Sequence, residues 1–229
     1  RDALTDYKDA TLQYHDVARK IAKLHILFQR SGIKEGEKIA LCGRNSAMWA
    51  AAFLATLTYG AVAVPIQHEF TPEMVYNIVN HSEARLLFVG DVVSPMLDAE
   101  QMPALEGIVY LPDFSLTMSR SEELTFAREH INKLFGEKYP KCFHAEHISY
   151  HQDVPEELAL INYTSGTTGF SKGVMLPYRA LWSNLMWAMH SMGPNMKPGD
   201  NVLCTLPMAH MYGMMVEFIF NFCFGNHLF

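Results

Sequence analysis

The sequence has few charged side chains. Its 18 basic and 24 acidic residues make up 18% of 229 and leave a net charge of −6, whereas typical domains are about 25% charged. Nucleic-acid binding needs a basic patch, yet at most two basic residues are adjacent, at Arg19 and Lys20. The composition therefore argues against nucleic acid as a partner. The low charge also predicts that something else covers part of the surface.

Cysteine is scarce and scattered. The four cysteines, at positions 42, 142, 204 and 223, form no CxxC pair, whereas disulfide frameworks and structural zinc sites need closely spaced cysteines. We therefore expect four reduced, buried thiols and a cytoplasmic protein. Gly and Pro together number only 25, and apolar residues make up 49% of the chain, which excludes disordered and collagen-like proteins.

The sequence also lacks a targeting segment and a clear membrane span. Residues 1–9 are charged and polar, so we expect no signal peptide. Residues 46–67 carry no charge and are long enough to cross a bilayer, but Thr, Tyr, Gly and Pro residues interrupt them. A core helix followed by a core strand explains this stretch better. Since no initiator Met is present, we expect a piece of a longer protein.

Apolar periodicity predicts that strands and helices alternate along the chain. We expect helices at 12–30 and 47–59, a third helix that begins at Pro72, and further helices at 95–101, 122–135, 178–190 and 212–224. Strands are expected at 38–42, 61–64, 86–89, 107–110, 158–163, 173–176 and 201–205. Thr11 and Thr71 are the expected caps of the first and third helices, and Ser119 is expected to open a capping box before the helix at 122. Nearly continuous apolar strands are typical of a parallel sheet covered on both faces. The predicted fold is therefore a doubly wound, mostly parallel α/β domain over 1–229, with an irregular connector near 112–156.

Small polar residues gather directly after the predicted strand at 158–163. The run is Thr164-Ser165-Gly166-Thr167-Thr168-Gly169-Phe170-Ser171-Lys172-Gly173. Glycines let backbone N–H groups turn toward an anion, hydroxyls add donors, and Lys172 adds positive charge. We expect the run at the carboxyl edge of the sheet, where α/β folds bind ligands. It is not a Walker A loop, which needs Gly before and Ser or Thr after the lysine. A flexible surface loop is the alternative interpretation.

The run resembles the phosphate-binding signature of the AMP-forming adenylating enzymes, although Ser171 stands where Pro is commoner. Further similar blocks are Gly43-Arg44-Asn45-Ser46 with Trp49, Gly60–Pro65, His81-Ser82-Glu83-Ala84 and Leu206–Gly213. Together these blocks are most similar to long-chain fatty-acid–CoA ligases, and the resemblance spans essentially the whole chain.

This resemblance implies an ATP-dependent ligase that converts a carboxylate, expected to be a fatty acid, to an acyl-adenylate and then to an acyl-CoA thioester. It implies ATP, Mg²⁺ and coenzyme A as cofactors and small molecules as partners. The residues implied in ATP phosphate binding are Thr164, Ser165, Gly166, Thr167, Thr168, Gly169, Ser171, Lys172 and Gly173. Thr164 is also implied as a Mg²⁺ ligand, and His210 as a catalytic residue between the acyl and phosphate pockets. The alternative for His210 is a helix-start histidine bonded to the backbone.

Several parts of the family's machinery are missing. The second nucleotide motif, aromatic-Gly-x-Thr-Glu, is not met at 212–216, and the later ribose-binding Asp and catalytic Lys are absent. We therefore expect an incomplete N-terminal AMP-binding domain that is inactive alone. A carrier-protein-loading adenylation domain and a non-catalytic nucleotide-binding module remain open, as does peripheral membrane contact of the parent.

The last segment of the chain, 211–229, is almost wholly apolar. Its one formal charge is Glu217. A helix that is hydrophobic all round must be buried, and we expect a strand that begins at Asn226 to leave backbone groups unpaired. These features predict that the fragment self-associates through this segment.

Overall fold

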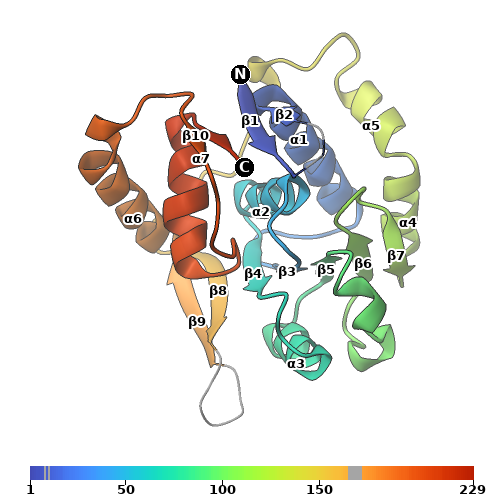
Figure 1. The fold of residues 1–229 in the computed structure, drawn as a ribbon. Helices are drawn as coiled ribbons and strands as arrows, with labels where there is room; N and C mark the ends of the chain where they lie inside the picture. The colour runs from blue at the N-terminus through green and yellow to red at the C-terminus, as the bar shows by residue number, and fades with distance from the viewer. Residues whose placement is uncertain (8, 10, 165–171) are drawn as a thin grey trace.

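Two β-sheets organise the chain (Figure 1). The computed structural model describes residues 1–7, 9, 11–164 and 172–229. Within these residues the larger sheet has seven strands in the order β7-β6-β5-β3-β4-β8-β9, and the smaller has four in the order β10-β11-β1-β2. The strands are β1 (Asp2–Thr5), β2 (Thr11–Gln13), β3 (Lys38–Cys42), β4 (Val62–Ile66), β5 (Leu86–Val89), β6 (Gly107–Tyr110), β7 (Leu116–Ser119), β8 (Leu158–Thr164), β9 (Lys172–Pro177), β10 (Asn201–Val202) and β11 (His227–Leu228).

Helices connect most of these strands. They are α1 (Tyr14–Arg30), α2 (Ala47–Tyr59), α3 (Pro72–Ser82), α4 (Glu122–Glu129), α5 (Ile131–Lys138), α6 (Tyr178–Ser191) and α7 (Phe220–Phe224), with a π-helical segment at Gly213–Ile219. The described part of the chain holds no helix that is both long and apolar enough to span a bilayer.

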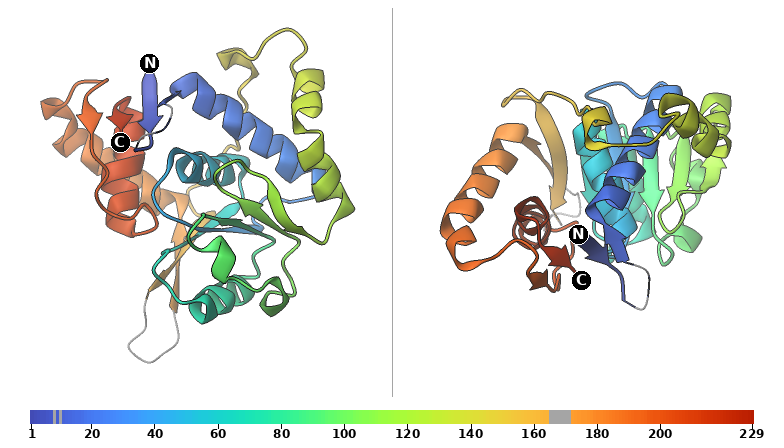
Figure 2. Two further views of the ribbon diagram at one scale, coloured as in Figure 1. Left: turned by 45° about the vertical axis from the view of Figure 1, so that its right-hand side comes forward. Right: turned by 90° about the horizontal axis from the view of Figure 1, so that it is seen from above.

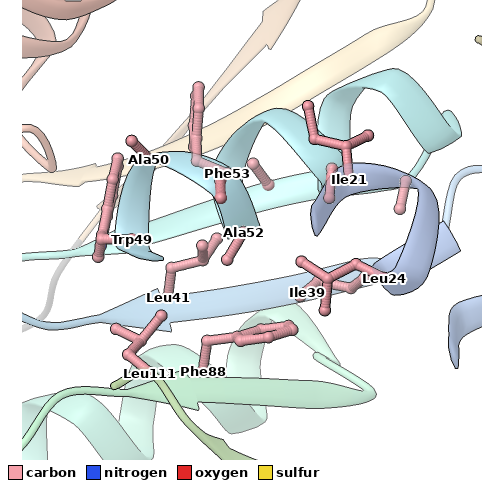
Figure 3. Packing of buried hydrophobic residues seen from close by; sticks show 14 of the residues in the cluster. Ile21, Leu24, Ile39, Leu41, Trp49, Ala50, Ala52, Phe53, Phe88 and Leu111 are labelled. Carbon is pink, nitrogen blue, oxygen red and sulfur yellow. The ribbon is translucent and has the colours of Figure 1, made fainter. Parts of the chain in front are cut away.

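The larger sheet is mostly parallel, as predicted. Strands β6, β5, β3, β4 and β8 run in one direction, and only the outer strands β7 and β9 are antiparallel. Alternate residues of β3 enter two separate apolar clusters: Ile39 and Leu41 face α1 and α2, whereas Ala40 and Cys42 face α3. Figure 3 shows the first cluster, with α1 and α2 packed over β3. The central strands are buried on both sides, which explains their continuous apolar sequence.

Local signals set both ends of α2 and the start of α3 where the sequence predicts them. The Ser46 hydroxyl accepts a hydrogen bond from the Trp49 N–H and so begins α2, and Gly60 ends it in the left-handed conformation with φ at 86°. Thr71 accepts from the Met74 N–H and Pro72 occupies the first position of α3. Caps of this kind satisfy the free backbone groups at helix ends.

The predicted caps of two other helices are wrong, although the second of these helices begins at Glu122 as predicted. The first helix begins at Tyr14 after an N-cap at Gln13, because residues 11–13 pair with β1 as strand β2. The cap of α4 is Ser121, which accepts from the Leu124 N–H. The expected helix at 122–135 is divided at His130 into α4 and α5. The expected helix at 95–101 consists of two short 3₁₀ turns, and the expected strand at 201–205 is limited to β10. Of the four cysteines expected to be buried, only Cys42 is.

The end of the chain forms part of the smaller sheet. Strand β11 lies between β1 and β10 and is parallel to both, with Leu228 opposite Leu4 and Val202. The expectation of an unpaired strand near Asn226 is therefore wrong. The N- and C-termini lie close together as a result (Figures 1 and 2). The π-helical segment before β11 is largely buried, including Met214, Phe218 and Ile219.

Candidate nucleotide-phosphate site

The β8–β9 hairpin places both ends of the predicted phosphate run. Because the two strands pair in antiparallel register, Thr164 lies opposite Lys172, and Tyr163 lies opposite Gly173. Strand β8 runs parallel to β4, so Thr164 ends it at the carboxyl edge of the sheet, as predicted. Ser165, Gly166, Thr167, Thr168, Gly169 and Ser171 lie outside the described residues.

The polar ends of this hairpin are available to a ligand. The side chains of Thr164 and Lys172 are both exposed, and neither has a hydrogen bond or ion pair within the described part of the chain. A hydroxyl and an ammonium thus stand on neighbouring strands at one sheet edge. Such a pair suits an anion with several oxygens, because each group donates to oxygen and Lys172 adds charge.

The base of the hairpin is held by close packing. A Cβ at Gly173 would lie 2.9 Å from Ile161 Cγ2 and 3.0 Å from the Tyr163 ring, so β9 approaches β8 only because this residue is glycine. Tyr163 is 4% exposed, and its hydroxyl lies 2.7 Å from His81 Nδ1 on α3. Burial raises the pKa of Tyr163. The structure thus joins two of the sequence blocks, 81–84 and 164–173.

Asn45 joins two further blocks, 43–46 and 206–213. Its Nδ2 donates to the Leu206 carbonyl at 2.8 Å, and its Oδ1 accepts from the Met208 N–H at 2.7 Å. One amide side chain from the β3–α2 turn therefore satisfies a donor and an acceptor on a loop 160 residues later. This loop leads directly to His210, so Asn45 sets where that histidine stands.

Glu217 holds the same loop from the other side. Its carboxylate accepts from the N–H groups of Thr205 and Leu206, each at 2.8 Å, and from the Thr205 hydroxyl at 3.1 Å. Glu217 belongs to the π-helical segment, and π-helical turns are frequent at functional sites. Sequence reasoning missed Asn45 and Glu217 as supports, although a single charge in an apolar segment was a signal.

His210 stands exposed at the start of this helical segment. Its N–H donates to the Pro207 carbonyl at 2.9 Å, and its carbonyl accepts from the Met214 N–H at 2.8 Å. Its Nδ1 lies 3.4 Å from the Tyr212 N–H. The last contact is the one expected of a helix-start histidine, and it leaves Nε2 without a hydrogen bond to the described residues. A catalytic role for His210 is therefore a proposal.

The described residues contain no group of three or more His, Cys, Asp or Glu side chains placed to hold a metal ion. Thr164, the residue implied as a Mg²⁺ ligand, supplies one exposed hydroxyl. Hard cations take oxygen ligands, and Mg²⁺ commonly completes its shell with phosphate oxygens and water. Thr164 is thus suited to contact Mg²⁺ as one ligand beside a bound polyphosphate.

Solved ligase structures share this fold. The anthranilate CoA ligase AuaEII, in complex with anthranoyl-AMP, superimposes with a TM-score of 0.78 at 21% identity, covering 100% of this chain and 41% of that chain. ATP-bound MatB from Rhodopseudomonas palustris has a TM-score of 0.74 at 21% identity, covering 100% and 42%. The architecture is therefore that of the N-terminal domains of adenylate-forming enzymes.

The chain belongs to the AMP-binding enzyme family, whose sequence pattern matches residues 1–229. A long-chain-fatty-acid–CoA ligase of Escherichia coli is 26% identical over 205 residues, covering 83% of this chain and 36% of the relative. Long-chain-fatty-acid–CoA ligase 5 of Rattus norvegicus is 24% identical over 228 residues, covering 94% and 32%. The chain spans about a third of the length of these relatives. The family resemblance read from the sequence is confirmed.

Proposed function

We propose that this chain is part of an ATP-dependent ligase that joins a carboxylate to AMP and then transfers the acyl group to coenzyme A. The observation that carries the proposal is the pairing of Thr164 with Lys172 at the carboxyl edge of β8, in a chain matched throughout by the AMP-binding family. The names of the relatives favour a fatty acid as the acyl substrate.

In this proposal the hairpin binds the β- and γ-phosphates of ATP. A carboxylate oxygen attacks the α-phosphorus, the bond to the bridging oxygen breaks, and pyrophosphate leaves with its negative charge. Donors aimed at that charge lower the barrier. Lys172 supplies the ammonium, Thr164 a hydroxyl, and 165–171 with Gly173 complete the loop. Mg²⁺ at Thr164 would offset phosphate charge when bound.

His210 is proposed to lie between the acyl and phosphate pockets. Its loop is held on both sides, by Asn45 and by Glu217, and such support keeps a side chain in place without induced movement. The exposed imidazole is free at Nε2 to donate to an oxygen of the reacting groups. We further propose that residues 1–229 are part of an N-terminal AMP-binding domain, with an irregular connector near 112–156. We also propose that the protein is cytoplasmic, and the absence of disulfides among its four cysteines supports this.

Carboxylate-dependent ATP–pyrophosphate exchange tests the activity. We expect the full-length protein to exchange and the 229-residue chain alone not to, because the ribose-binding and catalytic Lys elements are missing from it. Thioester formation with coenzyme A, against a carrier-protein thiol, then identifies the acceptor. ATP binding without any exchange by the full-length protein would instead indicate a non-catalytic nucleotide-binding module.

A further inference from the structure

A second candidate site lies on the α1 side of the sheet. A cavity of about 560 Å³, open to solvent on one side, is lined by α1, the first turn of α2, the turn after β6, and α4 with α5, together with Asp6, Asp9 and Leu12. Figure 2 shows α1 beside α4 and α5. The lining shares no residue with the β8–β9 hairpin or with the loop at 204–210. Its volume is within the range of small-molecule sites, about 300–1,000 Å³.

Four cationic side chains line this cavity: Arg19, Lys20 and Lys23 from α1, and Arg128 from α4. Lys23 Nζ donates to Asn132 Oδ1 at 2.8 Å, and Arg128 donates to the carbonyls of Asp113 and Phe114. These are neutral acceptors. Lys20 has neither a hydrogen bond nor an ion pair to any described residue.

Four carboxylates also line the cavity, those of Asp6, Asp9, Asp16 and Asp113. Asp6 accepts from the Ala47 N–H at 2.8 Å, Asp113 accepts from the Ser115 N–H at 2.8 Å, and Asp9 also has a partner. Asp16 accepts from the Gln13 N–H and lies 3.9 Å from Arg19. Within the described part of the chain, Asp6, Asp16 and Asp113 form no ion pair with Lys20 or Lys23.

Lys20 and Lys23 thus have no ion-pair partner among the described residues, although four carboxylates share the cavity with them. Burial and the neighbouring Lys20, Arg19 and Arg128 lower the pKa of Lys23. Burial lowers the pKa of Lys20, against a smaller opposing effect of Asp16. Both shifts have the sign expected where ammonium groups lack a counter-anion.

The rest of the lining is apolar. Leu24 and Leu27 of α1, Met48 of α2, Phe114 and Ile131 form the walls, and the two leucines are almost fully buried. An inorganic phosphate ion would fill only a small part of this volume. A matching ligand thus combines an anionic group, placed against the lysines, with an apolar body against these walls.

We propose that this cavity binds a phosphate monoester carried on a compact apolar body. Near neutral pH the phosphate carries close to two negative charges, which matches the two ammonium groups better than a carboxylate would. Its oxygens accept from Lys20 and Lys23 in charge-assisted hydrogen bonds, and Arg128 has further N–H groups to offer. The ester is held between helices, so a water-soluble compound is expected rather than a lipid in a bilayer.

Direct binding of phenyl phosphate to the full-length protein tests the proposal, by calorimetry at low salt. Inorganic phosphate lacks the apolar body, and phenol lacks the charged phosphate. Each is expected to bind at least tenfold more weakly than phenyl phosphate. The variant Lys20→Gln with Lys23→Gln is expected to weaken phenyl phosphate binding by at least tenfold, because it removes two charge-assisted contacts. The matched control is Lys141→Gln with Lys197→Gln, two exposed lysines outside the cavity, and it is expected to bind as the wild type does.

Equal binding by the lysine variant and the control would overturn the proposal, as would absence of phenyl phosphate binding. Both lysine variants should keep the circular dichroism spectrum and melting temperature of the wild type, so a loss of binding reports on the cavity. Vesicles containing phosphatidic acid test whether the protein instead binds a phosphate monoester in a lipid bilayer. Binding to these vesicles without binding of phenyl phosphate would place anion recognition on a membrane-facing surface, and the proposal would fail.

Discussion

Asn45 is the residue on which the loop before His210 most depends. The change Asn45→Ala removes both of its hydrogen bonds to that loop and leaves the N–H of Met208, a buried residue, without a partner. A buried unsatisfied donor costs about 1–3 kcal/mol, and we expect the free energy of unfolding, measured in urea, to fall by that amount. Asn77→Ala is the control, since Asn77 is exposed on α3. Equal stability of the two variants would show that Asn45 does not hold the loop.

His25 is expected to make stability depend on pH. Its Nε2 lies 3.1 Å from the Ala55 carbonyl and from the Thr58 hydroxyl, and burial lowers its pKa to about 4. Below the ordinary value of about 6.5 the unfolded chain binds a proton that folded His25 does not. Its contribution to stability is therefore full above pH 6.5 and is lost as pH falls toward 4, by up to about 1.4 kcal/mol per pH unit.

The measurement is urea unfolding of wild type and His25→Gln at pH 7.5 and 5.0. A variant is needed because His151 acts in the opposite direction: Glu157 and Glu35 raise its pKa. We expect wild type to lose more stability than His25→Gln between the two pH values. His190→Gln, a change at an exposed histidine, should behave as wild type. An identical pH dependence in all three proteins would contradict the burial of a neutral His25.

At the scale of elements, the π-helical segment and the loop before it form one unit. A Cβ on Gly213 would lie 2.4 Å from the Pro207 carbonyl oxygen, which belongs to the backbone. We expect Gly213→Ala to force the loop and the segment apart, at a cost of about 1–3 kcal/mol in the free energy of unfolding. Gly136→Ala is the matched control, because nothing lies within 4 Å of a Cβ there. This control should stabilise α5 by about 0.5–1 kcal/mol.

Elements with local signals could be predicted from sequence, and elements made by distant contacts could not. The bounds of α2 follow from Ser46 and Gly60, and the start of α3 follows from Thr71 and Pro72; each lies within four residues of what it controls. Strand β1 was not predicted, and the strand expected near Asn226 was predicted without its partners, because their pairing joins residue 4 with residue 228. The apolar pattern at 212–224 predicted a helix but not its π-helical segment. Within that segment Glu217 contacts the distant Leu206 N–H, and the apolar pattern does not encode this contact.

The same distinction holds for the candidate site. The run from Thr164 to Gly173 carries its chemistry in its own composition, and the structure places both of its ends at the expected sheet edge. The contacts of Asn45 with 206–208, and of His81 with Tyr163, join segments that are far apart in the chain. No spacing rule encodes such contacts, so only the fold shows them.

For the whole molecule, the exposed apolar surface differs from the prediction. Most of the large apolar side chains of 211–229, through which self-association is predicted, are buried within the chain, and the strand near 226 is paired. Trp182 and Trp187 of α6 and Met175 of β9 are instead at least 60% exposed. Apolar patches of this kind promote association.

Self-association of the 229-residue chain stays a prediction, and light scattering after size exclusion at micromolar concentration tests it. We expect assemblies larger than 26.0 kDa. Trp182→Ser with Trp187→Ser should reduce them more than Tyr212→Ser with Phe229→Ser does, because α6 presents more apolar surface. A monomeric wild-type chain would contradict the prediction. A larger reduction by Tyr212→Ser with Phe229→Ser would instead show that the chains associate through 211–229.

The central claim is that the β8–β9 hairpin binds the phosphates of ATP in an adenylate-forming ligase. Its most direct test is carboxylate-dependent ATP–pyrophosphate exchange by the full-length protein as wild type, Lys172→Ala and Lys172→Arg. Loss of one charge-assisted contact of about 1.5–3 kcal/mol predicts exchange about tenfold to a hundredfold slower in Lys172→Ala. Lys172→Arg should recover only part of it, because a planar guanidinium presents its donors differently from an ammonium. Undiminished exchange in Lys172→Ala would contradict the claim.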